Sequence, residues 1–193
     1  MPARILAFAA STRAASWNRK LLPILVAGAR DAGADVTVVD LLDYPMPIYS
    51  GDDEDAGGMP AAAVELLELL ARHDALLVVT PEYNGFFPPL LKNTLDWMSR
   101  PDPSGQSGLR HFSGKAAAIS SASPGGFGGV RSLLATRQYL SILGLTVIPE
   151  QVTIARAASA FTVEGRLADA KQHAAAHDVG ARLARLAARL AQP

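Results

Sequence analysis

The 193-residue chain contains no cysteine, no excess of charge of either sign and no long apolar run. Without cysteine, disulfides, thiolate nucleophiles and zinc-thiolate sites are excluded. The 18 Lys and Arg residues balance the 18 Asp and Glu residues, so no net field attracts nucleic acid or an anionic membrane. Every apolar run ends well short of the roughly 18 residues that span a bilayer. We therefore expect neither nucleic-acid nor membrane partners.

The amino-terminal segment also lacks the features of a secretory signal. A single basic residue, Arg4, leads directly into a strand-like run with no small-residue cleavage site. Together with the absence of cysteine, this favours a cytoplasmic protein. The length fits one domain covering residues 1–193, because domains usually contain roughly 100 to 200 residues.

Continuous apolar runs alternate with stretches of helical spacing along the chain. The runs are continuous rather than alternating, as expected for strands buried on both faces of a parallel sheet. The strands are predicted at 4–10, 36–40, 75–80, 116–120 and, more weakly, 145–154, and the helices at 18–30, 60–72, 89–99, 130–143 and 168–190. This order predicts an α/β fold with right-handed crossovers, a flavodoxin-like three-layer sandwich with a five-stranded parallel sheet of order 2-1-3-4-5.

Some segments need their own interpretation. Pro23 lies inside the first predicted helix, which should therefore be kinked or begin late. Residues 41–59 combine YPMPIY with GDDEDAGG, which indicates an ordered apolar hook followed by a solvated acidic loop. The last helix places Leu183, Leu186 and Leu190 on one face and should pack on the sheet, with its arginines in solvent.

The first strand is followed by the polar segment 11–18, immediately before a helix. Hydroxyls and free N–H groups at a helix N-terminus suit a phosphate, and a nearby arginine adds charge. Alternatively, Ser16 caps the helix and Arg13 points into solvent. Neither GxxxxGK(S/T) nor GxGxxG follows the strand, which argues against an NTP-hydrolysing loop and a Rossmann-type dinucleotide site. The candidate phosphate ligands are Ser11, Thr12, Arg13, Ser16 and Asn18.

The third and fourth strands end in loops rich in glycine, proline and aromatic residues. In segment 80–97, Tyr83 is placed to lie against a flat ligand and Asn84 to bond its edge. Phe86 and Phe87 either line a pocket or subunit interface or fill the core. In segment 120–131, four glycines surround Phe127, which permits close approach to a ring or partner, or else forms a mobile surface loop.

Together, these three loops resemble those of the NADPH-dependent FMN reductase family, which includes bacterial quinone, chromate and azo-dye reductases. The family's GSxRxxSxN is matched from Ser11 to Asn18, with Ala10 in place of the glycine, and this segment is implied to bind the FMN phosphate. The family's PEYN and GxxPxxLKNxxDW are matched by Pro81, Glu82, Tyr83, Asn84, Gly85, Pro88, Leu91, Lys92, Asn93, Asp96 and Trp97. Its SxSxGxxGGxR, which lines the flavin ring, is matched by Ser121, Ser123, Gly125, Gly128, Gly129 and Arg131.

The resemblance implies an FMN-dependent NAD(P)H oxidoreductase. Hydride would pass from NADPH or NADH through FMN, in a ping-pong cycle, to a small acceptor such as a quinone, free flavin, chromate or an azo compound. No catalytic side chain is needed, and the backbone of residues 82–85 would bond the pyrimidine edge of the flavin. A homodimer or homotetramer is implied, with Phe86, Phe87 and Trp97 near the interface. The implied cofactor-binding residues are Ser11, Thr12, Arg13, Ser16, Asn18, Pro81, Glu82, Tyr83, Asn84, Gly85, Ser121, Ser123 and Gly125.

Two other functions compete with this one. A flavodoxin-type electron carrier would bind FMN without oxidising a nicotinamide, but such carriers are usually strongly acidic and this chain is neutral. An interaction module would keep the fold and bind no flavin. A hydrolase is disfavoured because GxSxG does not occur. No metal is expected, because His173 and His177 lack a third ligand and GDDED lacks calcium-loop spacing.

Overall fold

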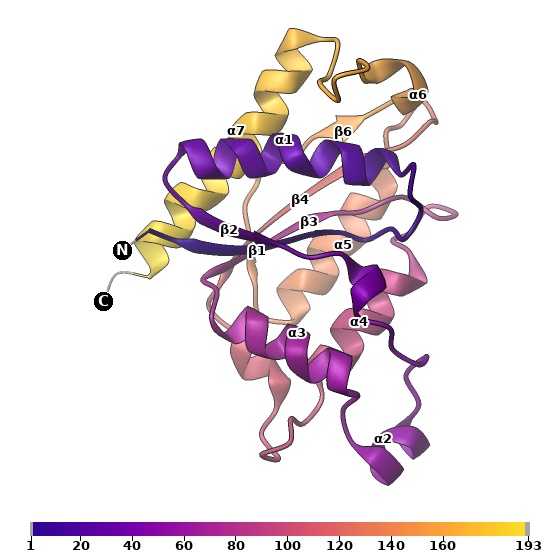
Figure 1. Ribbon diagram of the computed structural model, residues 1–193, viewed down its shortest axis with the longest axis vertical. Coiled ribbons are helices and arrows are strands. Elements are labelled where there is room, and N and C mark those ends of the chain that lie inside the picture. Colours follow the sequence, from indigo (N-terminus) through magenta and orange to yellow (C-terminus); the bar gives the residue numbers. More distant parts are fainter. Residues whose placement is uncertain (1, 192–193) are drawn as a thin grey trace.

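A parallel sheet forms the centre of the molecule, with helices on both faces (Figure 1). The computed structural model describes residues 2–191. The main strands are β1 (Arg4–Ala9), β2 (Asp35–Val38), β3 (Ala75–Val79), β4 (Ala116–Ala122) and β5 (Thr146–Val147). They pair in parallel in the order β2-β1-β3-β4-β5, so the predicted strand order and fold class are confirmed.

Side chains of the strands alternate between two apolar cores, one on each face of the sheet. Ile5 and Ala7 face α1 (Trp17–Asp31) and α7 (Ala170–Leu190), whereas Leu6 and Phe8 face α3 (Ala61–Ala71), α4 (Pro89–Ser99) and α5 (Val130–Ile142). All five residues of β3 are fully buried. Burial on both faces explains why the strands appear as continuous apolar runs.

The fifth predicted strand is divided into two short strands that both pair with β4. β5 pairs with Ala116 and Ala117, and β6 (Thr153–Ile154) pairs with Ser121 and Ala122. Pro149 lies between them and has no N–H to donate to a strand ladder. The prediction of one strand over 145–154 is therefore wrong in its middle.

The acidic segment and the first helix also differ from expectation. GDDED does not form a loop but the helix α2 (Gly51–Gly57), whose first turn carries three carboxylates where the helix dipole favours them. Helix α1 begins at Trp17 and continues through Pro23, so the late start is wrong. Pro23 is exposed, where water can bond the carbonyl that lacks a partner. The remaining short elements are α6 (Ala157–Ala160) and the 3-10 turns Leu41–Asp43 and Gly108–His111.

Helices α1 and α7 approach each other at two glycines. A Cβ atom on Gly28 would lie 1.8 Å from the carbonyl oxygen of His177, and one on Gly180 would lie 1.8 Å from that of Leu25. The two backbones therefore touch where these helices cross. Leu183 is buried there as predicted, but Leu190 is half exposed and contributes little to the core.

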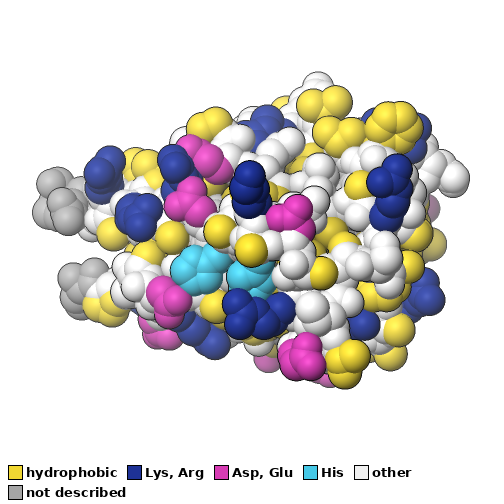
Figure 2. Space-filling view, turned by 90° about the horizontal axis from the view of Figure 1, so that it is seen from above, with side chains coloured by type: hydrophobic (Ala, Val, Ile, Leu, Met, Phe, Trp, Pro, Cys, Tyr) yellow, Lys and Arg dark blue, Asp and Glu magenta, His cyan; other side chains and the backbone are white. Residues whose placement is uncertain are grey.

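The face seen in Figure 2 carries both positive and negative side chains, with apolar side chains between them. This distribution matches the balanced composition of the chain. None of the helices within residues 2–191 is both long and apolar enough to cross a membrane. The same residues contain no group of three His, Cys, Asp or Glu side chains arranged to hold a metal ion.

Candidate functional site at the strand ends

The three predicted loops meet at the carboxyl ends of β1, β3 and β4. These strands are adjacent and parallel, so their carboxyl ends lie at one edge of the sheet. Two tethers join the loops directly: Asn18 bonds the end of β4, and Glu82 bonds the first turn of α5. The structure thus brings the three predicted loops together, although several of their side chains have roles other than those expected.

The loop after β1 presents free hydrogen-bond donors. Residues 12–15 are exposed, and their backbone N–H groups find no acceptor within the described part of the chain. Ser16 caps α1, because its hydroxyl accepts bonds from the N–H groups of Asn18 (3.2 Å) and Arg19 (3.5 Å). Arg13 is exposed beside these donors. The capping interpretation of Ser16 is therefore correct, while the rest of the loop keeps the features of an anion site.

The side chain of Asn18 is used within the protein and is buried. Its amide nitrogen donates to the carbonyl of Ala122 (3.0 Å), and its amide oxygen accepts from the N–H of Ala122 (2.8 Å). The expected donation of this side chain to a phosphate is therefore replaced by a bridge between α1 and β4. This long-range pairing fixes the first loop against the fourth strand.

The loop after β3 forms a tight hairpin. Tyr83 and Phe86 exchange two backbone hydrogen bonds, of 2.8 and 3.0 Å. Asn84 and Gly85 between them both have positive φ, 52° and 85°, as a type I′ turn requires. Tyr83 is half exposed, so its ring remains available to a flat ligand.

The two adjacent phenylalanines of this loop have different surroundings. Phe87 is buried and stacks on Tyr139 with a centroid distance of 5.2 Å, whereas Phe86 is half exposed. Trp97 is also buried and donates from its indole nitrogen to the carbonyl of Pro47 (2.8 Å). The alternative that Phe87 fills the core is therefore correct, and Trp97, which was expected near an interface, is buried as well.

Glu82 caps a helix from a distant loop. Its carboxylate accepts from the backbone N–H of Arg131 (3.2 Å) and from the guanidinium of the same residue (2.8 Å). The cap residue of α5, Gly129, has no side chain to do this. A carboxylate at a helix N-terminus is favoured by the dipole, so Glu82 stabilises both the loop after β3 and the start of α5.

The loop after β4 is tied down at several points. The N–H of Ser123 donates to Ile154, and Arg156 donates from its N–H to the carbonyl of Gly125 (3.1 Å). Ser121 is fully buried, and a Cβ on Gly129 would lie 1.9 Å from its hydroxyl. The Ser121 side chain therefore packs under Gly129 and is not offered to a ligand, contrary to expectation.

The polar residues of the LKNxxDW segment secure neighbouring structure. Asn93 accepts from the N–H of Tyr49 and donates to the carbonyl of Pro47, both at 2.8 Å, which holds the apolar hook against α4. Asp96 accepts from the hydroxyl of Tyr139 (2.7 Å). Burial, together with this carboxylate, raises the pKa of Tyr139 far above its usual range. These side chains hold the surroundings of α4 together and do not line the site.

Comparison with known proteins identifies the family. The family model described as NADPH-dependent FMN reductase matches residues 3–159. The chain belongs to this family. An NAD(P)H-dependent FMN reductase of Pseudomonas aeruginosa is 36% identical over 169 residues, covering 87% of this chain and 86% of the relative. A quinone reductase of Pseudomonas putida is 38% identical over 160 residues, covering 82% and 81%.

Solved structures of similar fold include a flavoenzyme and a flavodoxin. The FerB NAD(P)H:(acceptor) oxidoreductase from Paracoccus denitrificans matches with a TM-score of 0.80 at 24% identity, covering 97% of this chain and 98% of that one. An archaeal flavodoxin matches with a TM-score of 0.61 at 13% identity, covering 96% and 99%. An NAD(P)H oxidoreductase and a flavodoxin thus share this fold, so the family assignment rests on the sequence match and not on the fold.

The residues of the site fit the cofactor that the family name implies. A phosphate needs several donors and a compensating charge, and residues 12–15 supply free N–H groups beside Arg13. A planar ring needs an open surface with backbone groups near it. The hairpin at Tyr83 and the exposed glycines 125 and 126, which carry no Cβ, provide that surface. The donor set of this chain therefore suits FMN.

Proposed function

We propose that this chain is an FMN-dependent NAD(P)H oxidoreductase that reduces a small acceptor, such as a quinone, free flavin, chromate or an azo compound. The observation that carries the proposal is the family match over residues 3–159, whose three loops lie together at one edge of the sheet. An electron carrier is disfavoured, because the named relatives are reductases and the chain has no net charge with which to attract a protein partner.

Each loop has a separate task in this proposal. The free N–H groups of residues 12–15, with Ser11, Thr12 and Arg13, bind the phosphate of FMN at the N-terminus of α1. The backbone of the turn from Pro81 to Gly85 and the loop at Ser123 and Gly125 orient the ring, and Tyr83 flanks it. When bound, FMN supplies the redox chemistry, accepting hydride from NAD(P)H and passing it to the acceptor. Ser16, Asn18 and Glu82 hold the loops in position through their hydrogen bonds, and Ser121 packs beneath Gly129.

The proposal extends to assembly and location. We place residues 1–193 in a single FMN-binding domain in the cytoplasm, acting as a homodimer or homotetramer. Exposed large apolar side chains on the loops after β3 and β4 and on α5 support an interface, since exposed apolar surface of this kind often marks a contact with a partner. They include Phe86 (54% exposed), Phe127 (69%) and Leu134 (65%).

The deciding experiment is an anaerobic absorption spectrum of the protein reconstituted with FMN, before and after one equivalent of NADPH or NADH. We expect the absorption of the protein-bound flavin to bleach within seconds. A flavin that binds but stays oxidised with both nucleotides would replace the reductase with an electron carrier. Failure to bind FMN at all would favour an interaction module.

The role of Arg13 is tested by comparing two flavins. We expect Arg13→Gln to weaken FMN binding about tenfold, because one charge-assisted hydrogen bond to phosphate is worth about 1.4 kcal/mol or more. Riboflavin, which has no phosphate, should bind the variant and the wild type equally well. Calorimetric titration with both flavins measures the effect, and equal losses for FMN and riboflavin would show that Arg13 does not contact the phosphate.

A further inference from the structure

Residues 156–167, between β6 and α7, contact two of the loops that form the proposed cofactor site. They form α6 and then a short hairpin, which is closed by a bridge between Phe161 and Leu167. Figure 1 shows this segment above the first turn of α1. Its first residues meet the ring loop (residues 123–129, after β4), and its hairpin meets the helix that follows the phosphate loop (residues 11–16, after β1).

The first residues of the segment are attached to the ring loop by backbone hydrogen bonds. The N–H of Arg156 donates to the carbonyl of Gly125, and the N–H of Ala157 donates to the carbonyl of Ser123, both at 3.1 Å. Arg156 has a φ of 45°, in the left-handed region that residues other than glycine rarely adopt. Such a conformation persists only where the surrounding structure enforces it, so the attachment to the ring loop is fixed.

The hairpin of the segment is attached to the start of α1 by an aromatic stack. The ring of Phe161 stacks on that of Trp17, with 5.9 Å between the ring centroids and 11° between the planes. Opposite Phe161 in the hairpin, Leu167 is buried, and its N–H donates to Nδ1 of His173 on α7 (3.3 Å). The hairpin is therefore anchored in the core, and Trp17 is held against a fixed support.

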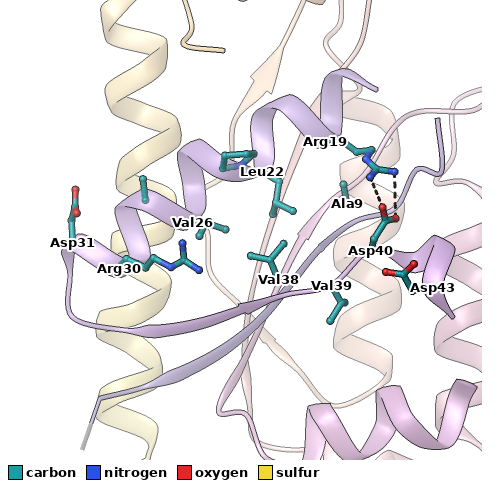
Figure 3. A pocket seen from close by; sticks show the side chains of 12 residues that line it. Ala9, Arg19, Leu22, Val26, Arg30, Asp31, Val38, Val39, Asp40 and Asp43 are labelled. Atoms are coloured by element: carbon teal, nitrogen blue, oxygen red, sulfur yellow. Dashed lines mark hydrogen bonds and ion pairs between the residues drawn. The ribbon is translucent and has the colours of Figure 1, made fainter. Parts of the chain in front are cut away.

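Three consecutive residues in the first turn of α1 are each bound to a different segment. Trp17 stacks on Phe161, and the amide of Asn18 bridges to the end of β4. Arg19 forms an ion pair with Asp40, which follows β2, at the rim of a groove between α1 and β2 (Figure 3). The free N–H groups of the phosphate loop come directly before this turn, so their positions depend on how the turn is held.

We propose that Phe161 is a positioning residue for FMN, which sets the phosphate loop relative to the ring loop through its stack on Trp17. The ring and the phosphate of FMN are joined by a ribityl chain of limited length, so both can bind only when the two loops lie at a matching distance. Because residues 156–167 hold both loops before the cofactor arrives, binding requires less ordering of the protein. The inference rests on the FMN site of the proposed function.

The test measures the binding of FMN and riboflavin to Phe161→Ala by calorimetric titration. We expect FMN affinity to fall about tenfold, near the upper value for a stacked aromatic pair. Riboflavin lacks the phosphate and should bind as tightly as to the wild type, because the bonds of Arg156 and Ala157 to the ring loop remain. Phe161→Tyr keeps the ring and should restore wild-type affinity for FMN. Val163→Ala is the matched control in the same hairpin, since Val163 is fully exposed, and should change neither affinity.

A second variant distinguishes positioning from a general loss of stability. Trp17→Leu removes the other ring of the stack and should weaken FMN binding about as much as Phe161→Ala does. Because both variants break the same contact, the double variant should lose no more FMN affinity than either one alone. Losses that multiply would show that the two rings act independently, which overturns the inference. Should Phe161→Ala fail to fold, Phe161→Leu keeps most of the apolar volume and carries the same expectation.

The outcomes separate this inference from the proposed function. If the wild type binds FMN more tightly than riboflavin and Phe161→Ala keeps that preference, the inference is overturned and the phosphate site stands. Equal losses of FMN and riboflavin affinity in Phe161→Ala would assign this side chain to general stability, which also overturns the inference. If the wild type binds neither flavin, or binds FMN no more tightly than riboflavin, the phosphate site of the proposed function fails and the inference fails with it.

Discussion

We expect Gly180→Ala to lower the free energy of unfolding by about 3 kcal/mol, at the upper end of the usual effect of overpacking. The added methyl group would lie 1.8 Å from the carbonyl oxygen of Leu25 and 2.9 Å from the backbone nitrogen of Ala29. Both contacts are with backbone, which cannot move aside as a flexible side chain would, so α1 and α7 must separate. For a chain of this size, the midpoint of thermal unfolding should fall by roughly 6 to 12 °C.

The control is the same substitution at a helical glycine with open space around it. Gly51 begins α2, and a Cβ there would have no atom within 4 Å. We expect Gly51→Ala to change stability by no more than about 0.5 kcal/mol. Gly28→Ala should resemble Gly180→Ala, since its methyl group would meet the His177 carbonyl at 1.8 Å. Wild-type melting temperatures for both variants would show that the two helices are not in backbone contact.

This crossing illustrates which parts of the fold are visible in the sequence. The strands are visible, because burial on both faces leaves runs such as Ala75–Val79 almost purely apolar. The close approach of Gly28 and Gly180 is not visible, because either glycine alone would suggest only a weak point in a helix. The crossing depends on where α1 and α7 meet, and the local pattern of neither helix contains that information.

The observed secondary structure differs from the predicted one in two segments, and each difference has a physical cause. The strand predicted over 145–154 is interrupted at Pro149, but both halves still pair with β4. The acidic run at 51–57 is helical because Ser50 caps it and Glu54 is held by Arg100 at 2.8 Å. Arg100 is far from this run in the sequence, and its hydrogen bond lowers the pKa of Glu54. Such partners become apparent only in three dimensions.

The candidate site, too, is only partly visible in the sequence. The three loops are predictable, because parallel strands bring their carboxyl ends to one edge and each loop has a distinctive composition. The tethers between them are not, because Asn18 and Glu82 act on residues 104 and 49 positions away. In the sequence, their side chains resemble ligands for a cofactor. In the structure, they position the backbone groups that remain free to bind one.

The tether at Asn18 leads to the second large effect. We expect Asn18→Ala to lower the free energy of unfolding by about 3 kcal/mol, because the N–H and carbonyl of Ala122 would both be left buried without a partner. FMN affinity should also fall, since the loop at residues 12–15 would lose its attachment to β4. Thermal unfolding and calorimetric titration with FMN measure the two effects.

Asn93 provides a matched comparison, because its amide also bridges two backbone groups of another segment. Its bond to Pro47 is exposed and its bond to Tyr49 is only partly buried, so water can replace them when the side chain is removed. Asn93→Ala should therefore cost only about 1 kcal/mol and leave FMN affinity unchanged. If Asn18→Ala were no more destabilising than Asn93→Ala, the Ala122 groups would have to be reached by water. If it lost stability but kept full FMN affinity, the bridge would stabilise the fold without shaping the phosphate loop.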